Sequence, residues 1–179
     1  GEIVFTELMY NPDDDEEARQ ALVPVPGPIR EPNAEWIEIH NPTDAPKSLH
    51  ECEMSDFDAM RMPNPEGDPT VISNMVVNPG EYKLFVRSDR PDRNGGLTAD
   101  HRFFFNLTNR GDTVRLRCGE TLVDEVTYTD NGAERGRARA QSIALDPMAL
   151  DAVTNDDPRA WCLASEMNVY LQVPEHMGT

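Results

Sequence analysis

The strongest constraint on the fold is a set of short segments in which apolar and polar residues alternate. Residues 3–10 and 35–40 alternate in this way, and they stop at Asn11-Pro12 and Asn41-Pro42 respectively. Alternation with a period of two is typical of a half-buried β-strand. Each proline ends its strand because it lacks the N–H that a ladder needs and biases the preceding residue away from the helical region.

Similar short runs occur along the rest of the chain. Further strands are predicted at 48–55, 71–77, 81–86, 103–105, 113–118, 121–128, 142–145 and 161–164. Only Gly119-Glu120 separates the strands at 113–118 and 121–128, which predicts a hairpin. The polar segment 88–99 is expected to be a loop. With no long amphipathic helix and no repeat, the pattern predicts one all-β domain spanning 1–179, an antiparallel sandwich or barrel of roughly nine or ten short strands.

One segment, residues 13–33, is unsuited to a strand or a stable helix. It begins with an acidic run, Asp13 to Glu17, and carries four prolines further on (Pro24, Pro26, Pro28 and Pro32). The sequence predicts a long exposed loop here. Such loops are uncommon in compact domains unless they are functional or mobile.

The charge balance excludes several classes of partner. The chain has 33 Asp and Glu against 16 Lys and Arg, for a formal net charge of −17. Nucleic-acid phosphates and anionic membrane surfaces require positive surfaces, so neither is expected to bind. No apolar run reaches the roughly 18 residues of a membrane span, so membrane insertion is not expected. The expected partner is therefore a protein, or a second copy of this chain.

No catalytic motif is present in the sequence. The histidines are scattered (His40, His50, His101 and His176), and no H-E-x-x-H, G-x-S-x-G, P-loop or dinucleotide fingerprint occurs. Glu7, Glu35 and Glu38 alternate with apolar residues and are expected to face solvent. We therefore predict no catalytic and no cofactor-binding residues.

The order of the motifs resembles the lamin tail domain, an immunoglobulin-like sandwich found in nuclear lamins and in bacterial secreted and surface proteins. The matching segments are 3–12, 35–44, 49–56, 78–82, 106–109, 111–112, 123–128, 146–147 and 155–158, followed by Trp161. The resemblance implies an immunoglobulin-like antiparallel β-sandwich. It also implies an accessory module of the kind attached to exported nucleases, phosphatases, adhesins and lipoproteins.

The function that follows from the resemblance is a non-catalytic, exported structural or interaction module, at the cell surface or in an extracellular assembly. The first strand, residues 3–10, is expected to pair with a neighbouring molecule by β-augmentation because it lies at the chain end. Two alternatives are a calcium- or carbohydrate-binding accessory domain of a secreted hydrolase, and an enzyme in its own right. The start at Gly1 and the family-like ending Gly178-Thr179 suggest a segment cut from a longer protein at a domain edge.

The three cysteines are expected to play structural roles. They form no C-x-x-C pair, which argues against zinc. Cys52 and Cys118 lie on predicted strands of one sandwich, and we predict a disulfide between them, worth about 2–4 kcal/mol and typical of an oxidising compartment. The family often has tryptophan at the position of Cys52, so the bridge would replace aromatic packing. The alternative is three unpaired buried thiols; Cys162 is expected to be free, or paired beyond Thr179.

Two charged segments are candidate binding sites. Asp13, Asp15 and Glu17 are weak candidates for calcium ligands, although a charge run is usually a solvated face. No metal or cofactor is therefore predicted, with calcium as the alternative. Arg135, Arg137 and Arg139 form the one basic patch expected from the sequence. They either pair with nearby carboxylates or dock on the acidic run of a neighbouring copy.

Overall fold

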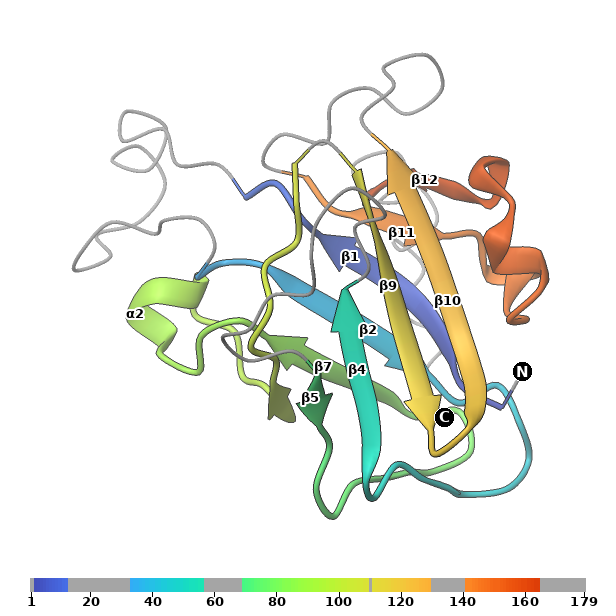
Figure 1. The fold of residues 1–179 in the computed structure, drawn as a ribbon. Helices are drawn as coiled ribbons and strands as arrows, with labels where there is room; N and C mark the ends of the chain where they lie inside the picture. The colour runs from blue at the N-terminus through green and yellow to red at the C-terminus, as the bar shows by residue number, and fades with distance from the viewer. Residues whose placement is uncertain (1, 13–32, 57–68, 110, 130–140, 165–179) are drawn as a thin grey trace, which may run out of the picture.

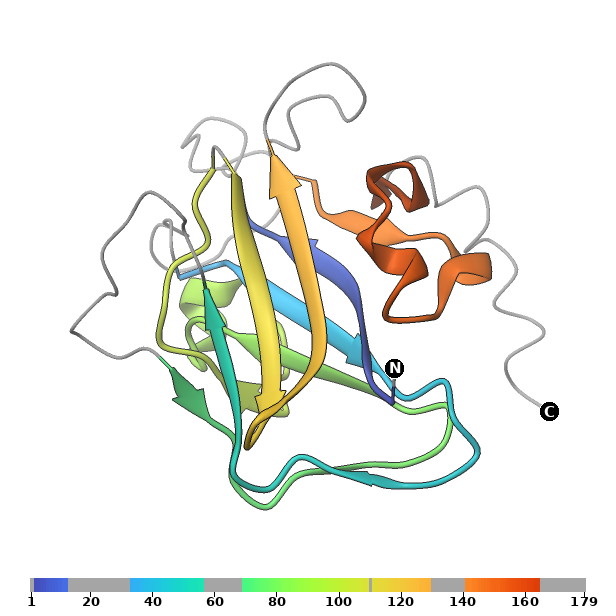
Figure 2. The same ribbon diagram turned by 45° about the vertical axis from the view of Figure 1, so that its right-hand side comes forward.

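The computed structural model describes residues 2–12, 33–56, 69–109, 111–129 and 141–164 (Figure 1). These residues form two main sheets that stack face to face, as Figures 1 and 2 both show. One sheet has the strand order β12-β11-β1-β2-β7-β8, the other has the order β10-β9-β4-β5, and β3 and β6 form a small third sheet. The predicted all-β, immunoglobulin-like sandwich is confirmed.

The six-stranded sheet is built around β1. Its strands are β1 (Val4–Met9), β2 (Trp36–His40), β7 (Tyr82–Val86), β8 (His101–Arg102), β11 (Ile143–Leu145) and β12 (Trp161–Leu163). All neighbours are antiparallel except β7 and β8, which run parallel. The register of β1 against β2 shifts between Phe5 and Glu7, so Thr6 is the extra residue of a β-bulge.

The four-stranded sheet contains the predicted hairpin. Its strands are β4 (Cys52–Asp56), β5 (Thr70–Val71), β9 (Gly111–Cys118) and β10 (Thr121–Thr129). Gly119 turns the hairpin with a φ of 58°, a conformation that glycine adopts without strain. A second bulge lies in β10 between Leu122 and Asp124. The small sheet pairs β3 (Lys47–Ser48) with β6 (Val76–Val77).

Helical structure in the described residues is limited to short pieces. The helix α2 (Pro91–Asn94) lies between β7 and β8, and three 3-10 turns, η1 (Pro147–Ala149), η2 (Thr154–Asp156) and η3 (Pro158–Ala160), lie between β11 and β12. In Figures 1 and 2, α2 and the 3-10 turns lie on opposite sides of the sandwich. Among the described residues, no helix has the length and apolar character needed to cross a membrane.

The core lies between the two sheets and receives alternate residues from their strands. The six-stranded sheet contributes Phe5, Ile37, Ile39 and Phe85, and the four-stranded sheet contributes Met54, Val114, Leu116 and Val126, all at most 1% exposed. Burial of each such side chain stabilises the fold by about 1.5–3 kcal/mol. The strict alternation along β9 explains why its strand and face could be predicted from sequence.

Two predicted strands are each divided between two sheets. Residues 48–55 form the end of β3 and most of β4, and residues 71–77 form parts of β5 and β6. The divisions coincide with Glu51 and Asn74, which take positive φ angles of 62° and 52°. Such angles interrupt an extended strand, so the chain changes sheet at these points.

Two other segments also differ from expectation. Residues 103–105 form no strand; Phe103 and Phe105 are fully buried from an irregular segment, while Phe104 is 44% exposed. Their apolar run therefore signals burial rather than strand pairing. The expected loop at 88–99 contains α2, which begins at Pro91 and is capped after Asn94 by Gly95, with a φ of 81°.

Candidate interaction surfaces

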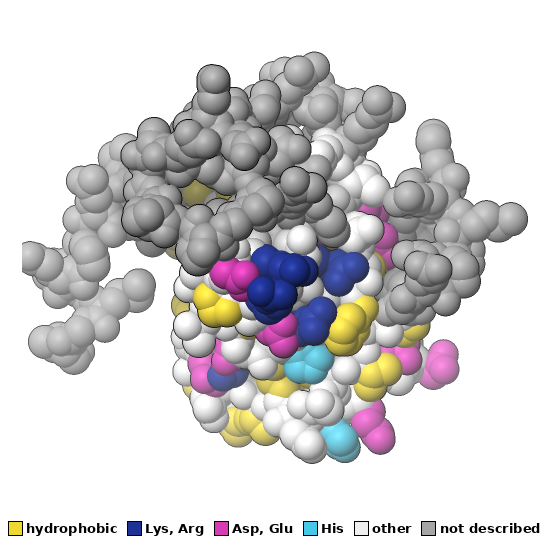
Figure 3. All heavy atoms as spheres, turned by 90° about the vertical axis from the view of Figure 1, so that its left-hand side faces the viewer, with side chains coloured by type: hydrophobic (Ala, Val, Ile, Leu, Met, Phe, Trp, Pro, Cys, Tyr) yellow, Lys and Arg dark blue, Asp and Glu magenta, His cyan; other side chains and the backbone are white. Residues whose placement is uncertain are grey.

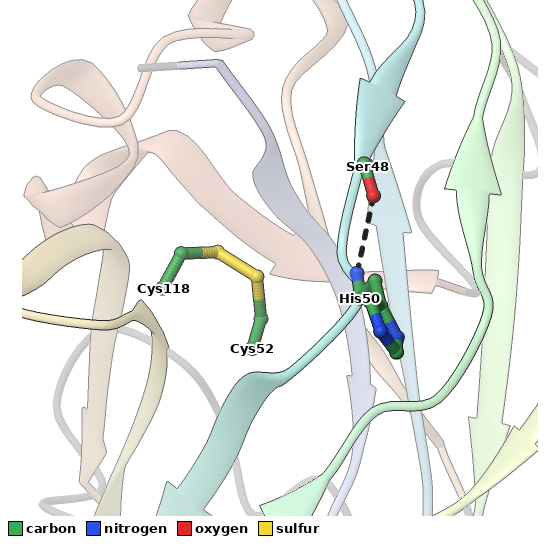
Figure 4. The surroundings of a disulfide bond; sticks show 4 residues. All are labelled: Ser48, His50, Cys52 and Cys118. Atoms are coloured by element: carbon green, nitrogen blue, oxygen red, sulfur yellow. Dashed lines mark hydrogen bonds between the residues drawn. A yellow bond between two sulfur atoms is a disulfide. The ribbon is translucent and has the colours of Figure 1, made fainter.

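The disulfide joins the two neighbouring strands β4 and β9. Cys52 and Cys118 are directly opposite in the register, with their Cα atoms 4.2 Å apart, and the structure links them in a disulfide as predicted (Figure 4). The turn before β4 is held by the N–H of Cys52, which donates to the carbonyl of Leu49, and by the N–H of His50, which donates to Ser48 Oγ at 3.3 Å. Cys162 is a free, partly buried cysteine on β12.

The first strand is an interior strand, so the expected β-augmentation through residues 3–10 is wrong. In the six-stranded sheet β1 lies between β11 and β2 (Figure 1). β11 pairs only with Glu7 and Leu8 of β1. The N–H of Phe5, beyond these pairs, donates to Asp124 Oδ2 at 2.7 Å. Both sides of β1 are therefore occupied, and a neighbouring molecule has no free edge to pair with.

Asp124 is a buried carboxylate that connects the two sheets. It lies on β10 and is 2% exposed. Besides the N–H of Phe5 on β1, it accepts the side-chain amide of Asn155 on η2 at 2.7 Å and the N–H of Glu125 at 2.9 Å. Burial raises the pKa of Asp124 to about 7, and these hydrogen bonds oppose the rise. The residue therefore joins β10, β1 and η2 at one point.

The sheet edges are poor sites for strand addition. The edge strands β12, β8 and β5 have three, two and two residues. The remaining edge strand of the two main sheets, β10, has nine residues, but it carries a bulge and the inward-pointing carboxylate of Asp124. Native proteins use short edges, bulges and inward charges to prevent edge pairing. Partner binding is therefore better sought on side-chain surfaces.

The three glutamates predicted to face solvent are all at least partly buried. Glu35 is 2% exposed, and its Oε2 accepts the N–H of Leu107 at 2.9 Å, so its predicted exposure is wrong. Glu7 and Glu38 are opposite each other on β1 and β2, each half-buried and each bonded to a hydroxyl, from Ser142 and Thr6 respectively. Burial raises the pKa of both carboxyls, and the charge of Glu38 raises that of Glu7 further.

Several residues of the recognised motifs are used to hold turns and strands. The amide of Asn41 donates to the carbonyls of Ala45 and Val77, and its oxygen accepts the N–H of Thr43 at 3.0 Å. The hydroxyl of Tyr128 donates to the carbonyl of Thr108 at 3.0 Å. Like Asp124, these polar groups are engaged by the fold itself.

An arginine patch lies on the side of the sandwich that carries α2. It consists of Arg87, Arg90, Arg93 and Arg102, and Figure 3 shows basic side chains gathered on this face. Parallel pairing of β7 and β8 places Arg102 opposite Val86, next to Arg87. Arg90 directly precedes α2 and Arg93 lies within it. The expectation that residues 135–139 form the one basic patch is therefore wrong.

The arginines of this patch are only partly neutralised. Arg102 Nη1 lies 3.6 Å from Asp89, its guanidinium is stacked over Phe104 at 5.2 Å, and its Nε is buried with no hydrogen-bond partner. Arg87 donates to the neutral Asn106 Oδ1 at 3.0 Å and has no ion pair within the described part of the chain. Burial lowers the pKa of Arg87. The negative charge of Glu35 opposes this shift, and the positive charge of Arg102 adds to it. Of the four arginines, Arg90 alone has a close carboxylate among the described residues, that of Asp92 at 2.8 Å.

Two predicted sites lie outside the described residues. They are the calcium candidates Asp13, Asp15 and Glu17, and the basic loop with Arg135, Arg137 and Arg139. Within the described ranges, no group of three or more His, Cys, Asp or Glu side chains is arranged to hold a metal ion. The absence of a cofactor stays a prediction.

Comparison with known proteins identifies a family. The family model described as Lamin Tail Domain matches residues 1–130, which is most of the chain. No curated protein matches significantly. Domains of this family are immunoglobulin-like and generally serve as non-catalytic protein-interaction modules. The strands β11 and β12 follow the matched region and still pair within the sheet of β1. The assignment of 1–179 to one domain stays a prediction.

Proposed function

Because the chain belongs to the lamin tail domain family, we propose that it is a non-catalytic interaction module of an exported protein, acting at the cell surface or in an extracellular assembly. The observation that carries export is the disulfide between Cys52 and Cys118. Disulfides form and persist in oxidising environments and are rare where thioredoxin and glutathione keep thiols reduced. The bridge therefore favours a location outside the cytosol.

The hydrogen bonds of the buried carboxylates support the proposal that the module is non-catalytic. Glu35 and Asp124, the most deeply buried carboxylates among the described residues, both accept backbone N–H groups from distant segments. Each joins segments that are far apart in sequence, which is a structural use of the group. Carboxylates used in this way are poor candidates for proton transfer, which needs a group within reach of a substrate.

The kind of partner is indicated by charge. With a net charge of −17, the chain favours proteins that offer complementary charge over nucleic acid or anionic lipid. The proposal includes contact between the basic loop, Arg135, Arg137 and Arg139, and acidic segments of other molecules. Because sheet edges are short or blocked, we place the binding on side-chain surfaces.

Export is tested by fractionating the cells that make the protein. We expect the protein in the envelope or extracellular fraction, with a cytosolic protein and a known exported protein as controls. Recovery in the cytosolic fraction alone would contradict the proposal.

A further inference from the structure

The arginine patch has more positive charge than its neighbours neutralise. Arg87 and Arg93 have no ion pair within the described residues, and the contact of Arg102 with Asp89 is long at 3.6 Å. The side chains of Arg90 and Arg102 are 55% and 39% exposed, so a ligand can reach them. The exposed ring of Phe104 lies against Arg102 and adds an apolar surface beside the charge.

The same chain carries a complementary segment. Asp13 to Glu17 form five consecutive acidic residues in a protein whose other acids are more dispersed. We propose that the arginine patch of one copy is the docking surface for the acidic run, Asp13–Glu17, of a second copy. This inference deepens the proposed function, on which it rests, by naming the partner and the surface.

The chemistry of the two segments fits. A guanidinium presents planar pairs of N–H donors that match a carboxylate in a two-bond arrangement, and stacking on an aromatic ring leaves its edge free to donate. Each copy carries both the patch and the run, so two copies related by a two-fold axis make the contact twice. The contact is thus self-complementary, and it closes as a dimer.

The dependence on salt gives this contact a distinctive signature. Two copies that each carry −17 repel one another at long range, most strongly at low ionic strength. The Debye length falls from about 30 Å at 0.01 M salt to about 8 Å at 0.15 M and about 3 Å at 1 M. We therefore expect dimerisation to be strongest near physiological salt and to weaken on both sides of it. An association driven by apolar contact would strengthen continuously with salt.

Sedimentation velocity at these salt concentrations tests the proposal with two variants. One carries Arg87→Gln and Arg102→Gln, and the other carries Asp13→Asn, Asp14→Asn, Asp15→Asn, Glu16→Gln and Glu17→Gln. Each variant alone is expected to be monomeric where the wild type dimerises. An equimolar mixture is expected to regain dimers that are weaker than those of wild type, because the run of the first variant can bind the patch of the second but only one of the two contacts is made. This recovery distinguishes contact between copies from contact within one copy.

Two further variants guard against a folding artefact. Arg159→Gln removes an exposed arginine that pairs with Asp157 near β12, at the opposite edge of the sheet from β8, and is expected to leave dimerisation unchanged. Arg90→Gln with Arg93→Gln alters only the rim of the patch at α2 and is expected to weaken the dimer several-fold.

Wild type that stays monomeric at every salt concentration, or a mixture that fails to associate, would overturn the proposal. The fractionation result stands independently of either outcome.

Discussion

Replacing both Cys52 and Cys118 by alanine is expected to lower the free energy of unfolding by about 4 kcal/mol. The bridge spans 66 residues of sequence, and a cross-link that closes so long a loop removes much of the conformational entropy of the unfolded chain. A typical domain is stable by about 5–15 kcal/mol, so the loss is a large fraction of the total. For a chain of this size the melting temperature should fall by roughly 10 °C.

Urea unfolding followed by tryptophan fluorescence measures this effect. Wild type in the presence of a reductant should match the double variant, and Cys162→Ala, which removes the free cysteine, should behave like oxidised wild type. If the double variant were as stable as oxidised wild type, the bridge would have no part in holding β4 against β9.

The second large effect is expected from Asp124→Ala, which should lower the free energy of unfolding by about 2–4 kcal/mol. The substitution leaves the N–H of Phe5 and the side-chain amide of Asn155 without their acceptor, and both residues are at most 1% exposed. An unsatisfied buried donor costs about 1–3 kcal/mol. Asp124→Asn keeps one acceptor oxygen of the same shape and should cost less.

The contribution of Asp124 is expected to depend on pH. Below pH 3.8, the ordinary pKa of aspartate, the carboxyl is protonated in both the folded and the unfolded protein. Between pH 3.8 and the folded pKa of about 7, only the folded protein holds the proton. Stability from this group is therefore fully present at low pH and is lost as the pH rises through about 7. The stability advantage of wild type over Asp124→Asn should be smaller at pH 8 than at pH 5. An advantage that grows with pH would show that the three donors favour the charged form.

The strands that sequence predicted well are those with local signals. β9 alternates without interruption, and Gly119-Glu120 can only close a tight turn between it and β10. By contrast, we expected β1 at a sheet edge because it lies near the end of the chain, and the sequence around it says nothing of its neighbours in the sheet. Its interior position depends on β11, more than 130 residues further along the chain, and local periodicity carries no information about such pairing.

The buried carboxylates could not be identified from sequence for a related reason. Glu35 and Asp124 occur in alternating or acidic stretches where a charged residue ordinarily faces water. Their burial is decided by backbone donors at Leu107 and Phe5, which tertiary packing brings to them. The only sequence signal was that both lie in segments that match the family pattern.

The arginine patch could not be predicted from the sequence because aspartates alternate with its arginines along the chain. Arg87, Arg90, Arg93 and Arg102 are interleaved with Asp89, Asp92 and Asp100, so the segment reads as nearly neutral. The arginines gather because β8 runs parallel to β7 and brings Arg102 beside Arg87, while Asp92 is paired with Arg90 and Asp100 is paired with Lys83. Charge counted along the chain therefore missed a patch that exists in space.

Trapping thiols in the cells that make the protein shows whether it is a disulfide-bonded module working in an oxidising compartment. Cells are treated with a permeant alkylating reagent under denaturing conditions before any reductant is added, and the protein is then weighed by mass spectrometry. We expect one alkyl group, on Cys162, and an intact bridge between Cys52 and Cys118. Three alkyl groups on the freshly trapped protein would contradict it.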